Sequence, residues 1–220
     1  MATKRYERLL SNLKRVDSLL ALHDILSKEA ADSVAKDKEA RSADILRAAV
    51  VLIHGSEEDY VRGVLSEWLI RKGDPSNIAD VPLAGEGKKR ATKFSLRSLL
   101  SFADIGVDDL IQKSIDEYFS LVSFNSYSEI ASQLGRIKID LSAFKRQDQI
   151  EKLIFRRHKI VHEVDIDSKN GRAKSINAAT VRSWKEAVAS MLEIVDKQIE
   201  AWEKAEVLSG AGASNKLCQE

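Results

Sequence analysis

Apolar residues recur every three or four positions along three long stretches of this sequence: residues 4–37, residues 42–71, and the residues that follow Asn177. This spacing places apolar side chains on one face of an α-helix, so it predicts long amphipathic helices. Both prolines lie in residues 73–92, where the second long helix should therefore end. There is no internal repeat and no β-rich region, and we expect an all-α bundle.

Shorter helices are expected between the long ones. Capping residues and polar breaks set their bounds. The first runs from near Phe94 and ends before Asp104 or Gly106, and the second begins at Val107 or Asp108. The third runs from Tyr127 to Leu134, and the fourth from Ser142 to residue 162. Asn170-Gly171 predicts the turn of a loop or small hairpin after the last of these. Ser42 and Asn177 are the expected N-caps of the second and the final long helix. One domain should span residues 1–205, followed by a flexible polar tail over residues 206–220.

The charges of the chain nearly balance, so they produce no overall positive potential that would attract nucleic acid. Its 35 Lys and Arg residues and 34 Asp and Glu residues leave a net charge of only +1, so a local group must hold any anionic ligand. No apolar run is long enough to span a membrane, and the N-terminal residues lack the apolar segment of a secretory signal. Because Cys218 is the single cysteine, we expect a cytoplasmic protein without disulfides.

Residues 155–165, FRRHKIVHEVD, combine two arginines and two histidines at the end of a predicted helix. At about 100° per residue, Arg157 falls inside an apolar arc. The members of this arc are Ile150, Leu153, Ile154 and Val161, with Ile160 at its margin. A guanidinium cannot lose its proton to ease burial, so Arg157 needs a carboxylate partner or a cleft that opens to solvent or ligand. Arg156 should point to solvent, and His158 and His162 should share a face.

A purely structural explanation pairs Arg157 with Glu57. This acid lies on the apolar face of the helix predicted over residues 42–71, and a buried acid needs a partner. His158 and His162 would then cap the helix end, where the helix dipole favours positive charge. The two histidines could also be zinc ligands, but the sequence offers no second histidine pair or cysteine cluster to complete the site. We therefore expect no metal and no cofactor.

A functional explanation uses the same side chains. An arginine that holds a phosphate and a histidine that titrates near neutral pH are the groups needed to cleave RNA through its own 2′-hydroxyl. The histidine would move a proton at the attacking or the leaving oxygen, and the guanidinium would stabilise the charge that develops around phosphorus. Such a reaction requires no metal ion.

The segment RHKIVH, from Arg157 to His162, resembles the signature of the HEPN domains: an arginine, four to six residues, and a histidine, often with a polar residue directly after the arginine. His158 occupies that polar position. The longer phrases LIFRRHKIVHEVDI and SADILRAAVVLIHGSEEDYVRGVLSEWL are similar to the RiboL-PSP-HEPN proteins and related bacterial subfamilies. The likeness spans roughly residues 40–205, with little specific support between residues 72 and 140.

The resemblance implies an all-α bundle that dimerises so that two signature helices face each other across a cleft with two arginines and two histidines. Family members with an intact signature are often metal-independent endoribonucleases of toxin–antitoxin, abortive-infection or other defence systems, whereas members with a degraded signature bind nucleotides or partners without catalysis. By this resemblance Arg157 and His162 are catalytic, and His158 orients them or contacts the substrate. The resemblance makes Glu58 the acid that holds Arg157, whereas the helical pattern makes Glu57 the buried acid.

Several further residues are candidates for contact with RNA. Arg156, Lys159 and Glu57 lie beside the signature residues, and the basic cluster of Lys88, Lys89 and Arg90 could follow a phosphate backbone. The alternative for that cluster is a solvated loop, since only Phe94 accompanies it as a base-stacking candidate. Besides RNA and a second copy of the chain, the expected partners are an antitoxin or a defence complex. The rival functions are a non-catalytic HEPN binding module and a helical scaffold.

Overall fold

The computed structural model describes residues 2–31, 36–79, 81–85, 96–168 and 170–208. Apart from one isolated bridge, the regular elements in these ranges are helices, which confirms the all-α prediction. The α-helices are α1 (Lys4–Ala31), α2 (Lys36–Lys72), α3 (Leu96–Leu99), α4 (Val107–Leu121), α5 (Tyr127–Gly135), α6 (Gln147–Glu163) and α7 (Ala178–Leu208). Two short 3₁₀ helices, η1 (Pro75–Ile78) and η2 (Leu100–Phe102), join them.

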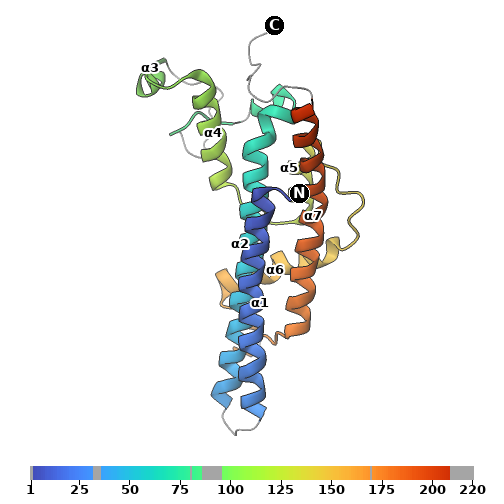
Figure 1. Cartoon of the computed structure of the whole chain (residues 1–220). Helices are drawn as coiled ribbons and strands as arrows, with labels where there is room; N and C mark the ends of the chain where they lie inside the picture. The colour runs from blue at the N-terminus through green and yellow to red at the C-terminus, as the bar shows by residue number, and fades with distance from the viewer. Residues whose placement is uncertain (1, 32–35, 80, 86–95, 169, 209–220) are drawn as a thin grey trace.

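Helix α2 is the centre of the bundle. It packs against α1 along much of its length and also contacts α4, α5, α6 and α7. Figure 1 shows α1, α2 and α7 as long neighbouring helices, with α6 crossing them and α4 standing to one side of the upper half of α2. The side chains of Ile53, Tyr60, Leu65 and Trp68 on α2 are at most 1% exposed. The apolar stripe read from the sequence therefore forms the core.

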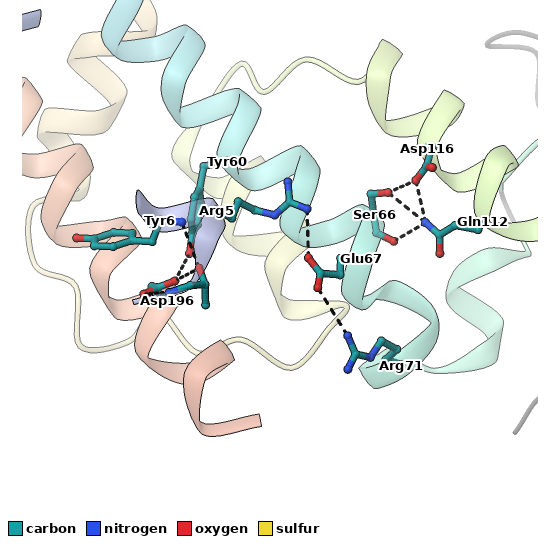
Figure 2. Close-up of polar contacts among 10 residues, drawn as sticks. Arg5, Tyr6, Tyr60, Ser66, Glu67, Arg71, Gln112, Asp116 and Asp196 are labelled. Carbon is teal, nitrogen blue, oxygen red and sulfur yellow. Dashed lines mark hydrogen bonds and ion pairs between the residues drawn. The ribbon is translucent and has the colours of Figure 1, made fainter. Parts of the chain in front are cut away.

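Polar contacts anchor the outer helices to this centre (Figure 2). The hydroxyls of Thr3 and Tyr60 both donate to the carboxylate of Asp196, which joins the start of α1 to α2 and α7. Ser66 of α2 donates to Asp116, and Gln112 Nε2 donates to the carbonyl of Ser66 at 3.1 Å, so both contacts fix α4 beside α2. Trp184 is buried, and Trp202 packs against Trp68 with 5.2 Å between the ring centroids, so both tryptophans of α7 are apolar anchors.

Several helix ends differ from those expected. Helix α1 is described as far as Ala31, residues 32–35 lie outside the described residues, and residues 36 and 37 belong to α2 rather than to the first helix. Ser42 lies inside α2 and is not its N-cap. Ser142 is also not a cap, because its N–H donates to Asp140 and α6 begins only at Gln147. Serines that hydrogen-bond locally favour turns as well as helix starts, so the sequence alone does not separate the two.

Other boundaries are confirmed. The N–H of Thr180 donates to Asn177 Oδ1 at 2.8 Å, as expected of an N-cap, and α5 begins at Tyr127. The short helical segment that was expected near Phe94 is seen from Leu96 to Phe102; Phe94 itself lies outside the described residues. Helix α7 continues to Leu208, so the first three residues of the expected tail are helical. In the described part of the chain, no helix is both long enough and apolar enough to cross a membrane.

Candidate active site

Helix α6 ends in a left-handed turn that is tied to the core. Val164 and Asp165 have φ angles of 53° and 55°, and the N–H of Asp165 donates to the carbonyl of Lys159 at 2.9 Å, which satisfies a carbonyl of the last helical turn. The Asp165 carboxylate is fully buried and accepts from Arg47 Nε and from an amino group of Arg156, both at 2.8 Å. We call Arg47, Arg156 and Asp165 the Asp165 node.

The hairpin that follows α6 completes this node. Ile166 pairs with Ala173 in a single antiparallel bridge, and Gly171 has the positive φ that the predicted Asn-Gly turn requires. The carbonyl of Lys174 accepts hydrogen bonds from Arg47 at 2.7 Å and from Arg156 at 3.2 Å. The node therefore joins α2, the end of α6 and the hairpin.

Arg156 differs from its prediction. We expected it to point to solvent and to contact substrate, but its side chain is 18% exposed and bonded to Asp165 and to the carbonyls of Lys174 and Ser175. Neither Asp165 nor Arg47 was recognised in the sequence, because Arg47 lies 118 positions from Asp165. Arg156 is a structural residue.

Arg157 points elsewhere and lines a pocket. Residues from α2, from the segment between α4 and α5, and from α6 form its walls: His54, Phe124, Asn125, Glu151, Ile154, Phe155, Arg157 and His158. Its volume is about 170 Å³. Among the described residues, Arg157 has no hydrogen bond or ion pair. Of the two environments that its sequence position allowed, the structure shows the open cleft.

The apolar arc around Arg157 is only partly buried. Ile150, Leu153 and Ile154 belong to the core as predicted, whereas Val161 is 47% exposed. The buried residues of α6 all lie in its first half; nearer its end, Ile160 packs at the edge of the core, and the described residues leave Val161 largely uncovered. Phe155 is 62% exposed on the same helix. The second half of α6 thus presents apolar side chains to the surroundings.

The two histidines lie on one face of α6, as their spacing predicted. Both are exposed, and their ring centroids are 4.7 Å apart with 43° between the ring planes. His158 lines the pocket, and His162 lies against it at a tilt, one turn further along the helix. The pocket therefore brings Arg157 and His158 together, whereas His162 lies outside the pocket wall and contacts the ring of His158.

Glu57 and Glu58 are both buried on α2, but only Glu58 has partners. Glu58 accepts a hydrogen bond from the N–H of Phe124 at 3.1 Å and pairs with Arg62 at 3.3 Å. Neither carboxylate oxygen of Glu57 has a hydrogen-bond partner in the described part of the chain. Burial, reinforced by the charge of Glu58, raises the pKa of Glu57 to about 8. Glu57 is therefore mostly protonated at neutral pH.

This arrangement corrects the expected partner of Arg157. Glu57 is 0% exposed, so it does not reach a substrate, and within the described residues neither Glu57 nor Glu58 forms an ion pair with Arg157. Glu58 instead approaches the pocket through His54, whose Nδ1 lies 3.7 Å from a Glu58 oxygen.

His54 is a site residue that sequence reasoning missed. It lies four positions before Glu58 on the same face of α2 and lines the pocket. Its ring is 2% exposed, and neither ring nitrogen has a hydrogen-bond partner among the described residues. Burial lowers the pKa of His54. The Glu58 carboxylate raises this pKa, Arg157 and Arg62 lower it, and a backbone interaction with Phe124 raises it, with a net lowering. The surroundings of His54 therefore favour the neutral form of its imidazole.

The remaining candidates divide into two groups. Lys159 pairs with Glu163 at 2.5 Å and lies 5.4 Å from the ring of Phe155, so it belongs to the exposed face of α6. Lys88, Lys89 and Arg90 lie outside the described residues. In the part of the chain that is described, no three His, Cys, Asp or Glu residues are grouped so that they could hold a metal ion.

Comparison with known proteins identifies the family. The RiboL-PSP-HEPN family matches residues 10–201, which include α2, the pocket, the signature helix α6 and most of α7. Neither the curated proteins nor the solved structures gave a match. Since the family match covers most of the sequence and includes both Arg157 and His162, the chain belongs to the RiboL-PSP-HEPN family.

Proposed function

We propose that this HEPN protein is a metal-independent endoribonuclease that cleaves RNA by attack of the 2′-hydroxyl on the adjacent phosphate. One observation carries the proposal: Arg157 lines an open pocket together with His158 and has no carboxylate partner among the described residues, and the His162 ring lies against that of His158. A guanidinium placed in this way is available for a phosphate, whose charge and oxygen spacing match its fork of donors. HEPN domains are frequently ribonucleases and commonly bind RNA.

The reaction needs two proton transfers. A neutral imidazole takes the proton of the 2′-hydroxyl while the 2′-oxygen forms a bond to phosphorus, and an imidazolium gives a proton to the departing 5′-oxygen. The products are a 2′,3′-cyclic phosphate and a 5′-hydroxyl. His162 is assigned the proton transfers, His158 orients it or contacts the substrate, and Arg157 stabilises the charge around phosphorus. Glu58 fixes the neighbouring wall through its contacts with His54 and Phe124.

A second copy of the chain would supply the second histidine. HEPN domains commonly dimerise, and in this chain α6 carries Phe155 and Val161 and is followed by its C-cap Val164; these residues are 62%, 47% and 72% exposed. Apolar groups in such a position favour association. A dimer formed through α6 would place two copies of Arg157 and His162 in one cleft, so that one imidazole accepts a proton while the other donates. In the cell, we infer the role of a toxin or antiviral effector that an antitoxin or a defence complex controls.

The alternative functions make different use of the same surface. In a non-catalytic HEPN module, Arg157 and the histidines would hold a nucleotide or a partner without a reaction. In a helical scaffold, Arg157 would need a structural partner, and the described residues provide none. The free guanidinium therefore argues for a ligand-binding site rather than a scaffold.

A cleavage assay separates these functions. End-labelled RNA is incubated in EDTA with the wild-type protein, with His162→Ala, and with Lys152→Ala, which removes an exposed cation of α6 outside the pocket. The wild-type and Lys152→Ala proteins should cut at equal rates and leave 2′,3′-cyclic phosphate ends, whereas His162→Ala should be slower by at least ~100-fold. RNA binding without cleavage by the wild-type protein would support the non-catalytic module, and cleavage by His162→Ala at the parent rate would refute the catalytic assignment.

A further inference from the structure

We propose that the pocket beside Arg157 binds one base of the RNA substrate and prefers a base with an exocyclic amino group over uracil. This inference rests on the proposed function, because it names the part of the substrate that the same site would recognise. It assigns specificity to Glu151, a residue that takes no part in the proton transfers described above.

The size of the pocket fits one base. Its volume is about 170 Å³, and a protein cavity of roughly 150 Å³ holds one benzene molecule. A single aromatic ring with its substituents therefore fills the pocket, and the second ring of a purine would extend toward the open side. A folded RNA helix could not enter, so the base must come from a single-stranded segment.

Aromatic side chains provide a stacking surface. Phe124 is buried in the wall, whereas Phe155 is 62% exposed at its edge. Lys159 Nζ lies 5.4 Å from the centre of this exposed ring, and an exposed phenylalanine is the kind of side chain on which an unstacked base lies. These contacts would hold any base, so they provide affinity and not selectivity.

The polar groups of the pocket lack enough protein partners. His54 is 98% buried, yet neither of its ring nitrogens has a hydrogen-bond partner in the described part of the chain. A neutral imidazole offers one donor and one acceptor, and leaving both unused in a buried position is unfavourable. The exposed amide of Asn125 lies in the same wall. A base edge, which carries donors and acceptors side by side, would satisfy such groups.

Glu151 determines which base edge fits. One of its oxygens accepts from the N–H of Tyr127 at 2.8 Å, which holds the carboxylate in the pocket wall and leaves the second oxygen without a partner among the described residues. A carboxylate only accepts hydrogen bonds, so it favours the amino group of cytosine, adenine or guanine. It repels the O4 carbonyl of uracil. Because Arg157 lines the same pocket, the selected base would adjoin the phosphate that is cut.

Binding can be measured without any reaction. The probes are 2′-deoxycytidine 3′-monophosphate and 2′-deoxyuridine 3′-monophosphate, which lack the attacking hydroxyl, titrated calorimetrically into the full-length wild-type protein. The cytosine probe should bind roughly tenfold more tightly, a ratio within reach of one good contact between a side chain and a base. Glu151→Gln, which can also donate to a carbonyl, should bring the two Kd values within about threefold of each other. The control Asp148→Asn removes another exposed carboxylate of α6 outside the pocket and should keep the wild-type ratio.

The outcomes distinguish this inference from the proposed function. Equal affinity of the wild-type protein for the two probes, or an unchanged ratio in Glu151→Gln, would refute the base pocket even if the protein cuts RNA. A tenfold preference that depends on Glu151 in a protein that cuts no RNA would support the pocket and refute the ribonuclease. If both hold, cleavage sites should be depleted in uracil on one side of the cut, and Glu151→Gln should restore cutting there.

Discussion

Arg156 and Arg157 are adjacent on α6, and their side chains have opposite surroundings. Arg156 turns toward the hairpin and is held by the buried carboxylate of Asp165 and two backbone carbonyls. Arg157, about 100° further around the helix, lines an open pocket without a carboxylate partner in the described part of the chain. The same residue type is thus structural in one case and available for a ligand in the other. The difference arises from what the neighbouring segments supply.

The acids of α2 form a second pair of this kind. Glu58 has partners in Arg62 and the Phe124 N–H, whereas Glu57 is buried without a hydrogen-bond partner among the described residues and is held protonated. In each pair, one residue is held by hydrogen bonds or ion pairs within the fold, and its neighbour has no such partner among the described residues. Substitutions at these positions should therefore separate effects on stability from effects on activity.

The largest effect on stability is expected at the carboxylate of the Asp165 node. Asp165→Ala would leave the guanidinium groups of Arg47 and Arg156 facing each other in a nearly buried site. Removing one partner of a buried ion pair costs about 3 to 5 kcal/mol, so the free energy of unfolding should fall by that amount. Urea denaturation monitored by circular dichroism measures it. A change below 1 kcal/mol would show that the node does not hold the end of α6.

Arg157→Ala should leave stability nearly unchanged and reduce the rate of RNA cleavage. Its side chain has no ion pair to lose in the described structure, so the free energy of unfolding should change by no more than about 0.5 kcal/mol. The rate of RNA cleavage should fall by about 100-fold to 1,000-fold, as when a donor to the transition state is removed. Denaturation and cleavage are measured on the same preparation. A destabilised protein that still cuts RNA would reverse the roles assigned to the two arginines.

Glu57→Gln tests the pair of acids through its pH dependence. The pKa of Glu57 is raised to about 8 in the folded protein from an ordinary value of 4.5, so its contribution to stability is full below pH 4.5 and declines as the pH rises toward 8. Between pH 6.0 and 7.5 the wild-type protein should lose about 2 kcal/mol from this group. Glu57→Gln should lack that loss, whereas Arg62→Gln should retain it. Parallel curves for Glu57→Gln and the wild type would contradict a protonated Glu57.

The smallest predicted effect is at Val164. A β-branched residue in the left-handed region is strained, and Val164 has φ 53° while its side chain is 72% exposed and makes little use of its apolar surface. Val164→Gly should therefore raise the free energy of unfolding by up to about 1 kcal/mol. Because Val164 also lies on the proposed dimer face, sedimentation should be measured beside denaturation. A weaker dimer with a more stable subunit would separate the two roles of this residue.

Much of the fold could be predicted from local patterns, since apolar spacing, polar breaks and the Asn177 cap report on residues near one another in sequence. The same pattern located Arg157 on the apolar side of α6 and placed His158 and His162 on one face. It could not show that the arc stays uncovered around Val161, because coverage depends on which helices cross α6. It also missed the contact between Arg47 and Asp165, and the approach of His54 to Glu58 and the pocket. These contacts depend on tertiary packing and not on periodicity.

The Asp165 node has a further consequence for the timing of motions at the site. The last turn of a helix usually frays, and this motion would make the position of any side chain there variable. In α6 that turn carries His162, but the backbone just beyond it is bonded to a helix more than a hundred positions earlier in the chain. Amide protons at Asp165 and Lys174, whose N–H groups are hydrogen-bonded, should thus exchange with solvent almost as slowly as those of α2. The imidazole of His162 would then bind its substrate from an already ordered backbone, so little conformational entropy would be lost on binding.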